Sequence, residues 1–111
     1  MQLNKEALKG HIDTLILSIL NREDCYGYEI AKKVRIKCNN TFELKEGTMY
    51  LALKRMESKS LIESYLGAES GVGGRRKYYK ITEEGKEALT IKKKEWYFIQ
   101  NIMNSFLEEE N

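Results

Sequence analysis

Apolar residues recur at three- and four-residue steps in three segments of the first 60 residues, which is the spacing of amphipathic helices. The first stripe stops at the polar turn 21–24 and predicts one helix from about residue 8 to 20. The second and third predict helices over about 26–37 and over 46–59. The apolar positions of the three stripes are Leu8, Ile12, Leu15, Ile16, Ile19 and Leu20; Gly27, Ile30, Ala31 and Val34; and Met49, Ala52, Leu53 and Met56.

Two short stretches farther along the chain, 61–67 and 76–81, are rich in β-branched and aromatic residues and flank a glycine-rich stretch. This pattern predicts a β-hairpin. Alternation along the second strand turns Tyr79 and Ile81 toward the helices and Arg76 away from them.

A long helix should close the chain. Thr82 is a suitable N-cap, acidic residues follow it in the first turn, and the helix is expected to run from 83 to about 107. The order of elements predicts a mainly α protein with a small β-hairpin (α+β). We expect a winged helix-turn-helix DNA-binding domain over 1–82 and a C-terminal dimerisation helix, packed on that domain, over 83–111.

The outward face of helix 46–59 carries cations and hydroxyls and no acid, as expected of a helix that enters a DNA groove. Its cations suit either guanine edges or phosphates. In the wing, 67–77, glycines allow close approach to a polyanion and cations supply charge for phosphates. The DNA-binding residues predicted from these patterns are Thr48, Tyr50, Leu51, Lys54, Arg55, Gly74, Arg75, Arg76 and Lys77.

The last helix has an apolar face too broad for one small domain to cover, which favours a homodimer. The residues expected at the dimer interface are Leu8, Ile12, Leu89, Trp96, Ile99, Met103 and Phe106. A symmetric dimer should bind an imperfect palindrome whose half-sites lie about 10 base pairs apart. The rival interpretation is a protein-docking winged-helix adaptor whose basic wing binds an acidic protein partner.

Four segments in this order resemble the PadR-type transcriptional regulators: LKGHIDTLILSIL at 8–20, YGYEI at 26–30, EGTMYLALKRME at 46–57 and GGRRKYYKITEEG at 73–85. The resemblance runs from about residue 5 to about residue 107. It implies a homodimeric, ligand-responsive repressor. Many members have glycine at the turn into the first strand of the hairpin, where this chain has Ser60.

The short chain resembles the compact, multidrug-binding branch of that family, in which a tryptophan of the last helix stacks on flat aromatic drugs. The matching residue here is Trp96, the only tryptophan. The resemblance therefore implies a planar aromatic effector bound by Trp96 with Leu15 and Ile99. The alternative is that Trp96 only fills the dimer core.

Composition excludes several other classes of protein. The longest apolar run is interrupted by Asp13 and is too short to span a membrane, so we expect no membrane partner and a cytoplasmic location. Cys25, Cys38 and the lone His11 lack the spacing of a disulfide framework or a metal site. No catalytic motif is present, so neither an enzyme nor a cofactor is expected.

Overall fold

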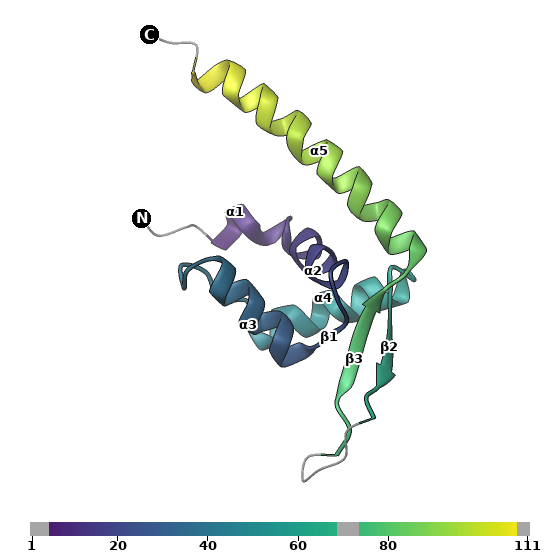
Figure 1. Ribbon diagram of the computed structural model, residues 1–111. Coiled ribbons are helices and arrows are strands. Elements are labelled where there is room, and N and C mark those ends of the chain that lie inside the picture. Colours follow the sequence, from purple (N-terminus) through teal and green to yellow (C-terminus); the bar gives the residue numbers. More distant parts are fainter. Residues whose placement is uncertain (1–4, 69–73, 109–111) are drawn as a thin grey trace.

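The computed structural model describes residues 5–68 and 74–108 of the 111-residue chain. Three helices, α2, α3 and α4, form one compact group, a β-hairpin projects from it, and the last helix leaves it as a long rod (Figure 1). In chain order the elements are α1 (Lys5–Lys9), α2 (Ile12–Leu20), β1 (Cys25–Tyr26), α3 (Gly27–Lys37), α4 (Glu46–Ser58), β2 (Ile62–Leu66), β3 (Lys77–Ile81) and α5 (Glu83–Leu107). The predicted mainly helical fold with a small sheet is confirmed.

The single helix predicted over about 8–20 is wrong, because the structure divides this segment into α1 and α2. Between them the amide of His11 donates to the carbonyl of Leu8 at 2.9 Å, and the His11 carbonyl accepts from the Leu15 amide at 3.1 Å. Leu8 of α1 and Leu15 of α2 both line one pocket, so the apolar spacing continues across the break. The spacing of apolar positions therefore does not reveal the break.

The sheet has three strands, where the sequence predicted two. The strand order is β1-β3-β2 and both pairings are antiparallel. Cys25 pairs with Tyr79, and Tyr26 pairs with Tyr78. β1 escaped prediction because a strand of two residues is too short to show any alternation.

The core lies where the three helices meet the inner face of the sheet. Tyr79 and Ile81 are buried there, which confirms the predicted orientation of the second hairpin strand. The apolar stripe of α4 is buried as predicted. The most deeply buried large side chains are Ile16, Leu17, Leu20, Ile30, Leu53, Met56 and Ile62.

The junction between the sheet and α5 is held by Thr82. Its hydroxyl accepts a hydrogen bond from the Gly85 amide at 3.0 Å, so it caps the helix as predicted. Its amide donates to the Leu61 carbonyl at 3.1 Å, and its hydroxyl donates toward the carbonyls of Ser60 and Leu61, at 2.7 and 3.0 Å. These bonds fix the direction in which α5 leaves the domain. Among the described residues no helix is both long and apolar enough to cross a membrane.

Candidate nucleic-acid interface

The outward face of α4 is the first part of the candidate interface. All five residues predicted from this helix are exposed, and Leu51 is the most open of its large apolar side chains, at 68%. An exposed aliphatic side chain on the same face as cations and hydroxyls suits a groove of DNA, where apolar contacts to bases accompany phosphate contacts. The five residues are Thr48, Tyr50, Leu51, Lys54 and Arg55.

Tyr50 is less available for contact with DNA than its neighbours on α4, because its ring lies across Gly27, the first residue of α3. A Cβ built on Gly27 would be 2.8 Å from Tyr50 Cζ, closer than real side chains allow. The end of the tyrosine ring therefore packs directly on the backbone of α3, and 44% of the residue remains exposed. Gly27 was predicted only as part of an apolar stripe, because the partner that demands a glycine lies 23 residues away in sequence.

Arg55 already has a partner within the domain. Its Nη2 lies 2.5 Å from Oδ1 of Asp13, on α2. The Asp13 carboxylate is largely covered, whereas about half of the guanidinium is exposed. Arg55 therefore presents to solvent a cation whose charge is partly compensated by Asp13. Lys54 next to it is exposed on the same face.

The cations of the wing point to opposite faces of the sheet. The guanidinium carbon of Arg76 lies 4.6 Å from the centre of the Tyr26 ring, on the outer face of the sheet. Lys77 extends the other way, with its ammonium 5.6 Å from the centre of the Tyr79 ring. Gly74, which precedes the cations, has a φ of +78°, in the region that favours glycine. The predicted wing tip, 69–73, lies outside the described residues.

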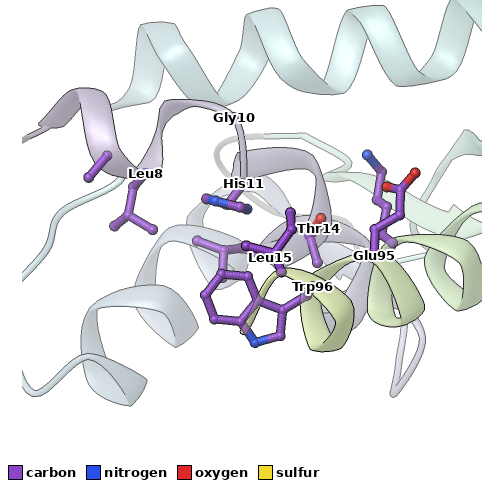
Figure 2. A pocket seen from close by; sticks show the side chains of 10 residues that line it. Leu8, Gly10, His11, Thr14, Leu15, Glu95 and Trp96 are labelled. Carbon is purple, nitrogen blue, oxygen red and sulfur yellow. The ribbon is translucent and has the colours of Figure 1, made fainter. Parts of the chain in front are cut away.

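A pocket of about 560 Å³ lies between α5 and the α1–α2 turn. Figure 2 shows the indole of Trp96 beside the side chains of Leu15 and His11. The imidazole meets the indole edge-on, with ring centres 5.5 Å apart. Leu15, Trp96 and Ile99 all line this pocket, so the structure brings the three predicted ligand residues together. His11 joins them, although no pattern in the sequence indicates that it should.

Beyond its first turns, α5 presents a broad apolar surface. The large exposed apolar residues along it are Ile91, Trp96, Tyr97, Phe98, Ile99, Ile102, Met103, Phe106 and Leu107. Two residues predicted at the dimer interface need correction, because Ile12 is 9% and Leu89 3% exposed within one protomer. Both belong to the core of the domain itself. Helical spacing marks an apolar face but does not say whether the chain's own domain or a partner covers it.

Cys25 of β1, beside β3 in the sheet, is buried and takes no part in this surface. The Lys33 ammonium lies 3.3 Å from its sulfur, but burial dominates and raises the pKa of the thiol. The nearby Glu23–Lys33 ion pair lowers the pKa of the carboxyl and raises that of the ammonium. Within the described residues, no group of three or more acidic, histidine or cysteine side chains is placed to hold a metal ion.

Comparison with known proteins identifies the family. The model of the transcriptional regulator PadR-like family matches residues 16–91. The chain belongs to the PadR-like family of transcriptional regulators. A PadR family regulator from Clostridium difficile is 64% identical, with 88% of this chain and 99% of that chain covered and a TM-score of 0.78.

Other proteins extend the likeness to nearly the whole chain. A transcriptional regulator from Clostridium thermocellum is 40% identical over 95% of this chain and 98% of that one, with a TM-score of 0.86. A PadR-like regulator from Bacillus cereus is 37% identical, covers 96% and 100% of the two chains, and has a TM-score of 0.81. An uncharacterised protein from Lysinibacillus sphaericus is 41% identical over 96% of both chains.

Membership in the PadR-like family decides between the classes of function. Its members are DNA-binding transcription regulators and not enzymes. The winged-helix arrangement of α3, α4 and the hairpin is the one expected for such a regulator.

Proposed function

We propose that this PadR-like regulator is a homodimeric, ligand-responsive repressor that binds an imperfect palindrome through α4 and the wing. The observation that carries the proposal is the exposed face of α4. It holds cations, hydroxyls and Leu51 beside a hairpin that carries Arg75 and Arg76. Repression itself is supported only by the resemblance to PadR-type repressors.

Two kinds of DNA contact follow from this surface. α4 enters the major groove, where Thr48 and Tyr50 donate to phosphates near its N-terminus and Lys54 lies deeper along the helix. The wing cations contact phosphates of the flanking backbone, because a charged hairpin supplies affinity without reading bases. Such a regulator acts in the compartment that holds the DNA, which fits the cytoplasmic location expected from the sequence.

Charge reversal in the wing tests this mode of binding. The double variant Arg75→Glu, Arg76→Glu should weaken binding to all DNA sequences. The slope of log affinity against log salt concentration should become shallower by about 0.9 for each phosphate that the wing no longer neutralises. The double reversal Lys93→Glu, Lys94→Glu on α5 is a matched control with the same change in net charge. Equal effects of the two double variants would show that only net charge matters. A protein-docking adaptor would instead bind DNA with no preference for the region upstream of its gene.

Dimerisation through α5 is proposed from the exposed apolar surface, together with the division of the chain into a winged domain, 1–82, and a dimerisation helix, 83–111. Leu8, Trp96, Ile99, Met103 and Phe106 remain in the proposed interface. An isologous contact with a second α5, or with the α1–α2 region of a second protomer, buries this surface.

Substitution of two residues of that surface tests the dimer. Phe98→Lys with Phe106→Lys should shift the sedimentation of the protein from dimer to monomer, because two lysines would have to be buried. Asn104→Lys changes an exposed polar residue of the same helix and should leave the dimer intact. A protein that sediments as a monomer before any substitution would refute the proposal.

The effector proposed from the pocket is a planar aromatic molecule that stacks on Trp96. The pocket is lined mainly by apolar groups, with Lys92 and Glu95 at one side, and the indole is 46% exposed within one protomer. A planar dye should quench the fluorescence of the single tryptophan at micromolar concentration. Trp96→Ala should abolish dye binding and leave a folded dimer. If Trp96→Ala dissociates the dimer and no dye quenches the wild type, Trp96 only packs the dimer core.

A further inference from the structure

One row of tyrosines crosses the outer face of the sheet. Tyr26 of β1 pairs in register with Tyr78 of β3, which pairs in turn with Tyr65 of β2. The rings of Tyr26 and Tyr78 meet edge-on with centres 5.5 Å apart, and those of Tyr78 and Tyr65 stack at 5.6 Å. The Tyr65 hydroxyl donates to the carboxylate of Asp24. The row therefore ties all three strands together at one level.

Arg76 lies against the end of this row. Its guanidinium carbon is 4.6 Å from the centre of the Tyr26 ring, within the range of a cation–π contact. Its carbonyl oxygen accepts a hydrogen bond from the Gly67 amide at 2.7 Å, one step beyond the last paired residues of the hairpin. Both the main chain and the side chain of Arg76 are thus held where the wing begins.

We propose that Tyr26 is a positioning residue, which holds the Arg76 guanidinium ready to contact a DNA phosphate. The contact with the ring holds the guanidinium carbon in place, and the N–H groups, which radiate outward in the guanidinium plane, can still donate to phosphate oxygens. A long arginine side chain loses much conformational freedom when it binds, and the tyrosine ring removes part of that cost beforehand.

Tyr26 also links the wing to the helix-turn-helix. It directly precedes α3, and its amide donates to Oε1 of Glu29 in the first turn of that helix at 3.2 Å. α3 in turn contacts α4 where the Tyr50 ring lies across Gly27. The cation of the wing is therefore fixed relative to α4, as simultaneous contact of both with one duplex requires.

A double-mutant cycle tests the proposal, which rests on the proposed DNA binding by the wing. Binding of the full-length protein to a labelled mixed-sequence duplex is measured at low salt for Tyr26→Leu, Arg76→Gln and the double variant. Tyr26→Leu should weaken binding about two- to five-fold, the size of an exposed cation–π contact. It should have no further effect in the Arg76→Gln variant, and Tyr26→Phe, which keeps the ring, should bind as the wild type does.

Arg75 provides the matched control cycle, since it carries the same charge one residue earlier and is exposed. Tyr26→Leu should weaken binding by the same factor with and without the substitution Arg75→Gln. An equal effect of Tyr26→Leu in the wild type and in the Arg76→Gln variant would overturn the positioning role and leave DNA binding by the wing intact. An Arg76→Gln variant that binds as the wild type would overturn the contact of Arg76 with DNA and the positioning role together, whereas DNA binding by the wing as a whole is tested by the charge reversal of Arg75 and Arg76.

A measurement on the unaltered protein guards against a Tyr26→Leu variant that does not fold. If the Arg76 guanidinium lies over the Tyr26 ring, the ring current should displace the proton resonances of the Arg76 side chain upfield relative to those of Arg75. Proton resonances of Arg76 that match those of Arg75 would overturn the proposal without any substitution in β1.

Discussion

Replacement of Gly85 by alanine should destabilise the protein, although alanine is the better helix former. Gly85 lies in the first turn of α5, where that turn passes directly over the start of β2. A Cβ built at this position would be 2.7 Å from Ile81 Cγ1 and closer still to the Leu61 carbonyl oxygen, whereas real Cβ contacts essentially never fall below 3.0 Å. The backbone of one of the two segments has to move.

The size of the effect follows from what that movement disturbs. The Leu61 carbonyl accepts a hydrogen bond from the amide of Thr82, and the Thr82 hydroxyl is shared between this carbonyl and that of Ser60. Overpacking of this kind costs about 1–3 kcal/mol, and breaking a hydrogen bond costs about 1 kcal/mol more. The helix propensity of alanine returns up to about 1 kcal/mol. We expect a net loss of about 1–3 kcal/mol in the free energy of unfolding.

Urea denaturation at a fixed protomer concentration measures this loss, because the stability of a dimer depends on concentration. Gly47→Ala is the matched control, since Gly47 occupies the first turn of α4 and a Cβ there meets nothing within 4 Å. That substitution should stabilise the protein by about 0.5–1 kcal/mol. A Gly85→Ala protein as stable as the Gly47→Ala protein would refute the reasoning.

Three further predictions concern backbone strain, ion pairing and pH. Ser60→Gly should raise the free energy of unfolding by about 0.5–1 kcal/mol, measured by urea denaturation, because Ser60 has a φ of +63°. Asp13→Asn should tighten DNA binding at low salt, because it frees the Arg55 cation from a partly exposed ion pair, and it should cost less than about 1 kcal/mol of stability. Unchanged DNA affinity would show that Arg55 does not contact DNA. Burial raises the pKa of Cys25 and of its strand partner Tyr79 above their ordinary values of 9.0 and 10.0. The stability that the two protonated side chains contribute is therefore complete below about pH 9 and is lost as the pH rises through the raised pKa values. Urea midpoints between neutral and alkaline pH should fall accordingly, and they should fall less steeply in Cys25→Ala than in Cys38→Ala.

The elements that the sequence predicted well are those with a long periodic pattern or a specific local signal. α5 begins after Thr82 and ends at Leu107 as expected, because a cap and an uninterrupted helical segment mark both limits. The apolar stripe of α4 likewise determined which residues face the core, and so which face is exposed.

What the sequence did not predict depends on contacts between distant residues. The ring of Tyr50 over Gly27, the Asp13–Arg55 ion pair and the edge-on contact of His11 with Trp96 each join different elements. None has a spacing that marks it. The two misassigned interface residues, Ile12 and Leu89, have the same cause, because they belong to apolar stripes whose partner is set by the tertiary fold.

The first turn of α2 contributes both to the proposed effector pocket and to an ion pair with the proposed DNA-binding face of α4. His11 and Leu15 line the pocket, while Asp13, between them in sequence, holds Arg55 on the exposed face of α4. A ligand that enters beside Trp96 therefore contacts the same turn of α2 that carries the Asp13 carboxylate. A displacement of this turn would change the distance between Asp13 and Arg55. It would therefore change how far the Asp13 carboxylate neutralises the Arg55 cation on α4. For this reason the Asp13→Asn variant should also respond less to a planar dye, since the pair through which the turn acts on α4 is gone.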